Sequence, residues 1–266
     1  TLYVTLEPCS TQGRTPPCTD LILEKGVGRV VVSVIDLNPA HAGRGLKLLE
    51  DAGVEVVSGV LEAEGRALIA PIEKFITPGA PYVTLKLAST LDGKIADSQG
   101  DSKWITGPEA RERVQAARRR ADAIMVGAAT VRADDPSLLP RPDEGRAPFR
   151  VIMGENVPEN AKVLTDAAAD RTLIYNGNLA ATMRDLAEEH GITHVFCEGG
   201  GRLAAGLIEA GLVDEFMFFI APKLMGADGL PNFGKTGGRI ADVDNLKFQS
   251  VEQVGNDILI IAKPER

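Results

Sequence analysis

Hydrophobic and polar positions divide the first 75 residues into short alternating segments. Residues 29–35 are rich in Val and Ile, which is typical of a strand buried in a parallel sheet. Residues 45–52 have a helical pattern, and residues 54–57 resemble a short strand. Residues 61–75 are again helical in pattern, although Pro71 is expected to kink or divide that helix. The alternation predicts βα units whose sheet is covered on both faces.

A break in the pattern follows at Thr77-Pro78-Gly79-Ala80-Pro81. Two prolines and a glycine within one short stretch cannot continue a helix or a central strand. We therefore predict a linker at residues 77–81, between a first domain at residues 1–76 and a second domain at residues 82–266.

The second region alternates in the same way and predicts a second α/β domain. A hairpin around Gly255-Asn256 is expected to close it. The predicted strands are residues 82–88, 123–126, 149–153, 172–175, 194–196 and 215–221, the predicted helices are residues 108–120, 182–189 and 202–210, and the hairpin strands are residues 247–254 and 257–262.

Composition places the chain among ordinary globular proteins, with 266 residues, of which 44% are hydrophobic and 25% charged. The net charge of −8 argues against nonspecific binding to nucleic-acid backbones, but it allows a phosphorylated small molecule held by a local cluster of cations. No apolar run reaches the length of a membrane span. Three cysteines (Cys9, Cys18 and Cys197) indicate a reducing compartment, so we expect a cytoplasmic protein.

Cys9 and Cys18 belong to the first chemical motif, in which Glu-Pro-Cys is followed by an eight-residue spacer and a second Cys. Two thiolates of this kind form half of the zinc site of nucleobase deaminases, in which a His-x-Glu supplies the third ligand and the proton shuttle. No His and no second Glu precede this motif in the chain, and His41 is a weak candidate for a replacement ligand. Two ordinary buried cysteines are the alternative, which Pro8 and the Gly-Arg-Thr-Pro-Pro loop disfavour. We expect an incomplete zinc site and no measurable deaminase activity from this chain.

The cysteine motif and its wide spacer resemble the bifunctional deaminase–reductase of riboflavin biosynthesis. That family joins a zinc-dependent diaminohydroxyphosphoribosylaminopyrimidine deaminase to an NADPH-dependent 5-amino-6-(5-phosphoribosylamino)uracil reductase. Thr11 and Gln12 stand where family members often carry a His after the Cys-Ser pair. The resemblance implies an incomplete cytidine-deaminase-like domain, lacking its N-terminal part, followed by a dihydrofolate-reductase-like domain.

Four ordered segments of the second region resemble the reductase part of the same family. Their order and close spacing make the resemblance far more specific than any one segment would. They are residues 86–94 (KLASTLDGK), residues 102–108 (SKWITGP), residues 127–136 (GAATVRADDP) with Leu138 and Arg141, and residues 197–203 (CEGGGRL).

The resemblance also implies which residues form the reductase site. Asp134 is implied as the catalytic group, either as a proton donor or as an orienting group. The implied NADPH-binding residues are Ser89, Trp104, Thr130, Asp134, Gly200, Gly201, Arg202, Leu203, Ala204, Ala205 and Gly206, and the implied substrate-binding residues are Lys86, Ser102, Arg118, Leu138, Arg141 and Glu198.

Considered alone, several of these residues have structural explanations. Glycines between a strand and a helix let backbone N–H groups approach a phosphate, but they also form plain tight turns. The Asp134-Asp135-Pro136 turn is often only a cap, and Trp104 could anchor a core. The run Arg118-Arg119-Arg120 at a helix end could simply complement the helix dipole, and we expect at least one of the three to do only that.

The sequence thus favours an enzyme that reduces a phosphoribosylaminopyrimidine and, by resemblance, forms homo-oligomers. A non-catalytic nucleotide- or zinc-binding remnant is the alternative, and a broader dihydrofolate reductase is a weaker one. Oxidation of NADPH with the aminouracil substrate, compared with dihydrofolate, distinguishes these hypotheses.

Overall fold

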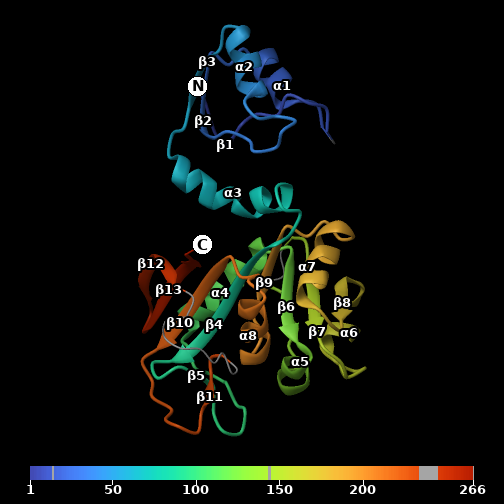
Figure 1. Cartoon of the computed structure of the whole chain (residues 1–266), viewed down its shortest axis with the longest axis vertical. Coiled ribbons are helices and arrows are strands. Elements are labelled where there is room, and N and C mark those ends of the chain that lie inside the picture. Colours follow the sequence, from blue (N-terminus) through green and yellow to red (C-terminus); the bar gives the residue numbers. More distant parts are fainter. Residues whose placement is uncertain (14, 143–144, 234–244, 266) are drawn as a thin grey trace. The chain divides into compact units, whose positions relative to one another are not determined.

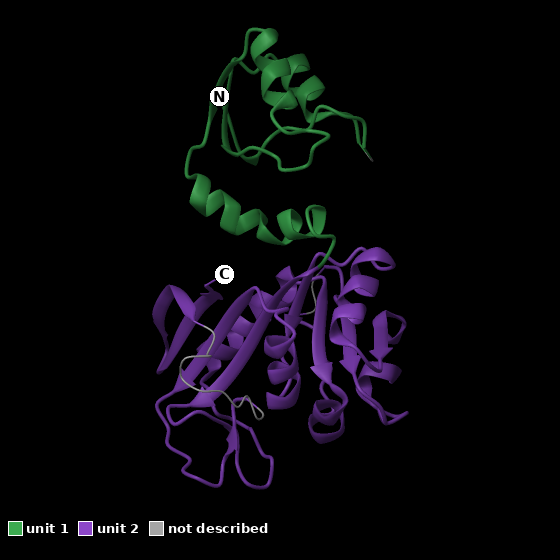
Figure 2. Cartoon of the chain, viewed as in Figure 1, with its two compact units in different colours: residues 1–80 green, residues 81–266 purple. Residues whose placement is uncertain are grey.

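The chain forms two compact units, Thr1–Ala80 and Pro81–Arg266, drawn in green and purple in Figure 2. The computed structural model describes residues 1–13, 15–142, 145–233 and 245–265. The division between the units falls inside the segment 77–81. None of the helices in these described ranges is long and apolar enough to cross a lipid bilayer.

A parallel sheet of three strands, in the order β1-β2-β3, forms the centre of the first unit (Figure 1). Val30 and Val32 of the central strand are fully buried and pack with Leu49. The strands are β1 (Leu2–Leu6), β2 (Arg29–Val34) and β3 (Glu55–Ser58), and the helices are α1 (Cys18–Glu24), α2 (Arg44–Asp51) and α3 (Glu62–Ile76).

Two expectations for this unit are met only in part. The edge strand β1 alternates between half-buried and exposed residues, and Tyr3 is 73% exposed, so the described helices do not cover both faces of the sheet there. Helix α3 is not divided at Pro71, because residues on both sides of the proline belong to one helix. Its buried residues, Gly65 and Ile69, hold it against the sheet, and a side chain at Gly65 would collide with Ser33, since a Cβ there would lie 2.2 Å from the Ser33 Oγ. Packing along the helix therefore outweighs the hydrogen bond that proline cannot donate.

The second unit contains an eight-stranded sheet in the order β12-β13-β10-β4-β9-β6-β7-β8. The strands from β10 to β8 are parallel, whereas β13 and β12 add an antiparallel hairpin beside β10. The strands are β4 (Tyr82–Thr90), β6 (Ala123–Gly127), β7 (Phe149–Met153), β8 (Thr172–Tyr175), β9 (His194–Cys197), β10 (Glu215–Ala221), β12 (Leu246–Val254) and β13 (Asp257–Pro264), and the short strands β5 (Lys94–Ala96) and β11 (Leu230–Pro231) pair apart from this sheet.

Helices cover both faces of this larger sheet and bury a separate core on each side. Met183, Leu186 and Leu207, from α7 and α8, pack on one face. Val114 and Val131, from α4 and α5, pack on the other. The helices are α4 (Pro108–Arg120), α5 (Ala128–Asp134), α6 (Lys162–Thr165), α7 (Leu179–Glu188) and α8 (Gly201–Glu209), with a 3-10 turn, η1 (Ala169–Arg171).

The strands and helices predicted for the second region are all present, with ends shifted by a few residues; α7, for example, begins at Leu179 rather than at residue 182. This confirms an α/β architecture built on a central sheet.

Candidate active site

The order of strands creates a crevice between β6 and β9. These strands are neighbours, but β6 continues through α5 to β7 on one side, and β9 continues through α8 to β10 on the other. The helices that follow these two strands, α5 and α8, therefore pack on opposite faces of the sheet. In open α/β sheets, ligands bind at the carboxyl ends of the strands at such a point.

A cavity of about 600 Å³ lies at this end of the sheet, within the second unit. It brings together most of the site residues that the sequence implies, from segments separated by more than a hundred positions. Its lining includes Lys86, Ser102, Trp104, Arg118, Thr130, Asp134, Leu138, Arg141, Glu198 and Gly200.

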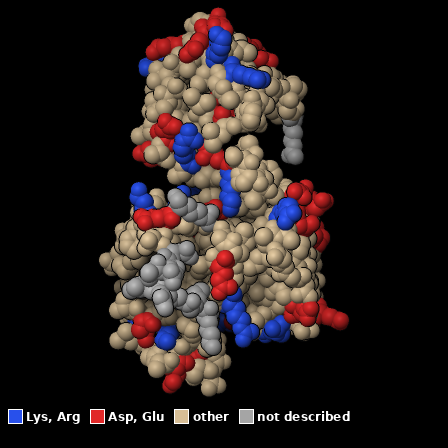
Figure 3. Space-filling model, in the orientation of Figure 1, with Lys and Arg blue, Asp and Glu red and all other residues tan. Residues whose placement is uncertain are grey.

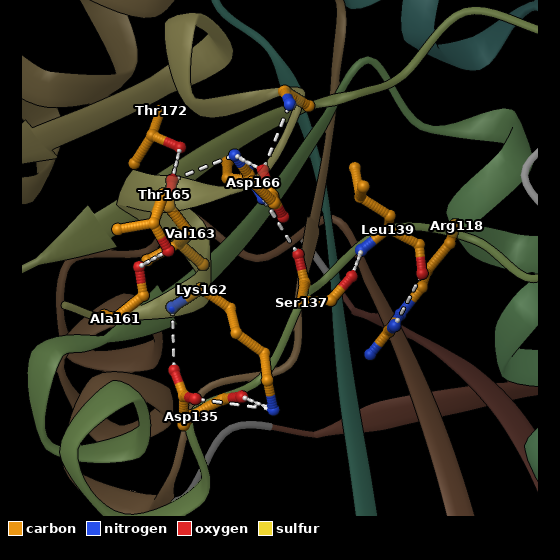
Figure 4. A network of polar contacts seen from close by, with 12 residues as sticks. Arg118, Asp135, Ser137, Leu139, Ala161, Lys162, Val163, Thr165, Asp166 and Thr172 are labelled. Atoms are coloured by element: carbon orange, nitrogen blue, oxygen red, sulfur yellow. Dashed lines mark hydrogen bonds and ion pairs between the residues drawn. The ribbon is translucent and has the colours of Figure 1, made fainter.

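Three charged side chains, Lys86, Arg118 and Glu198, form one wall of the cavity. Arg118 of α4 binds Glu198 through two contacts, Nε to Oε1 at 2.6 Å and Nη2 to Oε2 at 3.1 Å. The third nitrogen, Nη1, donates to the Leu139 carbonyl at 3.2 Å, and Figure 4 shows this contact. Lys86 lies beside Glu198, because Leu85 and Cys197 are register partners in β4 and β9 and these residues follow them.

The pKa values of this group follow from burial and from mutual attraction. Burial by itself would raise the pKa of the Glu198 carboxyl, but Arg118 and Lys86 outweigh it and hold that pKa below its usual range. Burial lowers the pKa of the Lys86 ammonium, an effect that Glu198 opposes and Arg118 reinforces. Glu198 is therefore a carboxylate at neutral pH, next to a lysine that releases its proton more readily than an exposed one.

The two aspartates at the end of α5, Asp134 and Asp135, have different partners. Asp135 has a left-handed backbone with φ of 39° at the end of the helix, and its Oδ1 accepts from the Lys162 backbone N–H at 2.8 Å. Figure 4 shows Asp135 facing Lys162. Both aspartates belong to the cavity lining, but the Oδ1 of Asp134 lies 3.4 Å from the Nζ of Lys103 instead. The structural role expected of the Asp-Asp-Pro turn thus falls to Asp135, which leaves the Asp134 carboxylate facing the cavity.

Trp104 does not anchor a core. Its side chain is 62% exposed and lines the cavity, with the Arg111 guanidinium 4.4 Å from the ring centroid. Lys223 Nζ donates to the Trp104 carbonyl at 2.7 Å, and this hydrogen bond helps to fix the backbone at Trp104. A large flat side chain fixed at a cavity edge can stack against a planar ring.

The glycine segment borders the cavity only at its beginning. Gly199 and Gly200 line it, and Gly200 is the N-cap of α8, where no side chain caps the helix. The backbone N–H groups of the first turn are therefore available to an anion. The remaining residues implied for cofactor binding, which are Ser89, Gly201, Arg202, Leu203, Ala204, Ala205 and Gly206, are not in the lining; of these, Ser89, Ala204 and Ala205 are buried.

Arg141 differs from the other cations of the cavity. Its backbone is fixed, because its N–H donates to Gln115 Oε1 at 2.8 Å and its carbonyl accepts from Arg119 Nη1 at 3.1 Å. Among the described residues its exposed guanidinium has no hydrogen bond or ion pair, whereas that of Arg118 is engaged by Glu198. Arg141 is thus the cation most available to a phosphate.

Three basic residues of the lining were not among the site residues implied by the sequence: Lys103, Arg111 and Lys162. Two of them adjoin implied residues, since Lys103 precedes Trp104 and Arg111 contacts it. On the face drawn in Figure 3, acidic and basic side chains are mixed over both units, without a broad basic surface.

The first unit holds the two cysteines of the proposed zinc site. The sulfurs of Cys9 and Cys18 are 3.4 Å apart, close to the separation of roughly 3.7 Å that two thiolates have on one tetrahedral zinc. Within the described ranges, however, no group of three or more His, Cys, Asp or Glu side chains could hold a metal ion. His41 therefore does not complete the set, and the donors fit half of a zinc site. Glu7 of the same motif is structural, because its carboxylate accepts from the Gly43 and Gly45 backbone N–H groups.

A charged cavity at the switch point of a parallel sheet defines the class of α/β enzymes that bind nucleotides or similar phosphorylated ligands. Comparisons with known proteins narrow this class. Residues 81–260 match the family model described as the RibD C-terminal domain. The chain is 40% identical to the riboflavin biosynthesis protein RibD of Bacillus amyloliquefaciens, over 99% of the chain and 79% of that protein.

Solved structures agree with the sequence comparison. The structure of Acinetobacter baumannii RibD matches with a TM-score of 0.89 and 34% identity, over 99% of this chain and 80% of that one. A Thermotoga maritima diaminohydroxyphosphoribosylaminopyrimidine deaminase/5-amino-6-(5-phosphoribosylamino)uracil reductase matches with a TM-score of 0.87 and 34% identity, over 98% and 78%. The chain belongs to the RibD family of riboflavin biosynthesis proteins.

Proposed function

We propose that the second unit is the NADPH-dependent reductase of riboflavin biosynthesis. Its reaction would convert the ribosyl group of 5-amino-6-(5-phosphoribosylamino)uracil into the open ribityl chain. The observation that carries this proposal is the convergence of Lys86, Glu198 and Asp134 on one cavity at the switch point. Membership of the RibD family, in which the Thermotoga relative carries the reductase name, supports the same reaction.

The cavity suits a phosphorylated dinucleotide at the first turn of α8. A Cβ built at Gly200 would meet nothing closer than Thr130 Oγ1 at 4.0 Å, so there is open space above an uncapped helix N-terminus. We expect Gly200 and Thr130 to border the cofactor phosphates and Trp104 to stack on a ring. Bound NADPH would supply the hydride for the sugar carbon.

Two cations would have separate roles toward the substrate. Arg141 is the proposed ligand of the substrate phosphate, because its guanidinium is exposed to the cavity. Arg118 would act indirectly, since its bidentate contact keeps the Glu198 carboxylate charged and oriented. Glu198 can then accept hydrogen bonds from sugar hydroxyls, with Lys86 donating to a neighbouring oxygen.

Asp134 is the proposed acid or orienting group for the proton that accompanies the hydride. Its carboxylate lies at the cavity wall, and Lys103 is its only described ionic partner. Asp134→Asn keeps the shape of the side chain but removes its ionisable carboxyl group. It should therefore lower turnover by about tenfold to a thousandfold.

The test measures NADPH oxidation by the purified chain with the phosphoribosylaminouracil and, separately, with dihydrofolate. We expect NADPH oxidation with the phosphoribosylaminouracil and none with dihydrofolate. Turnover should be lower in Asp134→Asn and unchanged in the control variant Asp170→Asn, since Asp170 is an exposed residue outside the cavity. Turnover of dihydrofolate would support a broader reductase. NADPH binding without any turnover would support a non-catalytic nucleotide-binding protein.

For the first unit we propose that residues 1–76 are part of a zinc deaminase domain. Two thiolates alone make a weak metal site, so we expect the purified 266-residue chain to release no ammonia from the diaminopyrimidine substrate. The control is Cys9→Ala. Ammonia release above that control would contradict the expected inactivity and would indicate that a further residue completes the metal site.

A further inference from the structure

The segment 136–141 borders the cavity and belongs to no helix or strand. Leu138, near its centre, has a left-handed backbone with φ of 59°, and its side chain is buried with Ile152 and Val163. A leucine adopts this backbone conformation only where the surrounding structure holds it there. The shape of this cavity wall is therefore maintained by contacts from neighbouring elements.

Two arginines fix backbone carbonyls of the segment. The fully buried Arg150 donates from Nη1 to the Ser137 carbonyl at 3.2 Å. Arg118 donates from Nη1 to the Leu139 carbonyl, also at 3.2 Å. Figure 4 shows Ser137 and Leu139 on this segment. Each guanidinium is itself held by an ion pair with a carboxylate, so both anchors are firm.

Arg141, at the end of the segment, is held at its backbone by two side chains of α4. Gln115 Oε1 accepts from the Arg141 N–H at 2.8 Å, and Arg119 Nη1 donates to the Arg141 carbonyl at 3.1 Å. Gln115 and Arg119 are four residues apart and so lie on one face of the helix. Neither is among the described residues that line the cavity. Both therefore act on the cavity through Arg141.

Fixing both polar groups of one residue fixes the direction in which its side chain leaves the backbone. The Arg141 guanidinium itself stays exposed at the cavity, with no hydrogen bond or ion pair to a described residue. A cation whose backbone is already ordered loses less conformational entropy when it binds an anion. The contacts from α4 should therefore strengthen the binding of a phosphate that they do not touch.

We propose that Gln115 is a positioning residue of the substrate phosphate site. By holding the Arg141 backbone, it increases the preference of the cavity for a phosphorylated over an unphosphorylated ribosylaminopyrimidine. This inference rests on the proposed role of Arg141 as the ligand of the substrate phosphate. Gln115 is a better test residue than Arg119, because it is neutral and cannot attract a phosphate through its own charge.

The experiment measures binding by calorimetry in the absence of NADPH, so its result does not depend on turnover. The full chain is titrated with the phosphoribosylaminouracil and, separately, with its dephosphorylated form. Gln115→Met keeps the length of the side chain and its helix propensity but removes the acceptor. We expect it to weaken binding of the phosphorylated compound by about threefold to tenfold, the scale of one hydrogen bond. Binding of the dephosphorylated compound should not change.

Two controls show whether the effect is specific. Gln249→Met makes the same substitution at an exposed residue of β12 and should bind both compounds as the wild type does. An unchanged Kd for NADPH in Gln115→Met would show that the cavity is still folded.

A double variant tests whether Gln115 acts through Arg141. In Arg141→Ala the phosphate has already lost its proposed ligand. Adding Gln115→Met to this variant should therefore weaken binding no further, because the two residues act as one unit.

Equal weakening for both compounds would overturn the inference, and so would unchanged binding of the phosphorylated compound or a further loss in the double variant. A wild type that binds both compounds equally would overturn it together with the proposed role of Arg141. Preference for the phosphorylated compound that depends on Gln115, without any NADPH oxidation, would support the inference and count against the reductase proposal alone.

Discussion

Glu198 and Arg118 form a nearly buried ion pair, with 10% and 13% of their side chains exposed. Glu198→Gln keeps the shape of the acid but leaves the guanidinium buried without a countercharge. We expect the free energy of unfolding of the second unit to fall by about 3 kcal/mol at neutral pH. Urea unfolding followed by Trp104 fluorescence measures it, and Glu209→Gln on the exposed end of α8 is the control.

The same variant should change how stability depends on pH. The pKa of Glu198 is lower in the folded chain than its ordinary value of 4.5. The unfolded chain therefore takes up the proton first, so the stabilisation is complete above that value and is lost as pH falls through the folded pKa. The difference between wild type and Glu198→Gln should shrink in this acidic range. A difference that stays constant there would refute the assignment of the ion pair.

The sequence predicted the chemical nature of the site better than it predicted which side chains contact each other there. Apart from the family resemblance, nothing in the local sequence distinguishes Asp134 from Asp135, because their difference arises from the left-handed residue that ends α5. The contact between Arg118 and Glu198 joins residues that are far apart in the chain, and it depends on the order of strands. Of the other two arginines in that run, Arg119 donates to the Arg141 backbone carbonyl.

At the scale of whole elements, the strands of the main sheet and the longer helices of the second unit were predicted, whereas the short elements α5, α6, β5 and β11 were not. The strands β7, β8 and β10 were located to the residue, because β-branched and aromatic residues fill them. The elements α6, β5 and β11 are too short to show a period. The pairing of Ala96 with Leu230 exists only because the fold brings two distant loops together. The insertion of β9 between β4 and β6, which creates the crevice, likewise has no signature in hydrophobic periodicity.

Gly199 and Gly200, just before α8, should respond differently to substitution, because only Gly199 lies against a side chain of the helix. A Cβ at Gly199 would lie 2.6 Å from Leu203 Cδ2 and 3.0 Å from its Cβ, whereas Gly200 has open space. We expect Gly199→Ala to displace the first turn of α8 and to lower stability by about 1–3 kcal/mol. Gly200→Ala should fold normally and weaken NADPH binding. Denaturation and NADPH titration of both variants test this, and equal effects on stability would contradict it.

Across the whole molecule, the two units have cores of different size. The first unit buries one small cluster, which consists of Ile22, Val30, Val32, Leu46, Leu49 and Val54. The second unit buries two larger clusters, one on each face of its sheet. Because hydrophobic stabilisation grows with the apolar area removed from water, the first unit should be the less stable of the two.

Thermal unfolding should therefore occur in two steps, and the chain contains a probe that separates them. Its single tryptophan, Trp104, lies in the second unit, so fluorescence reports on that unit while circular dichroism reports on both. We expect an early dichroism change without a fluorescence change. NADPH at a hundred times its Kd should stabilise only the later step, by about 2.7 kcal/mol, because the ligand binds the folded second unit alone. Gly200→Ala should show a smaller shift at the same NADPH concentration, because its binding is weaker. A single transition seen by both probes, moved as a whole by NADPH, would show that the units unfold together.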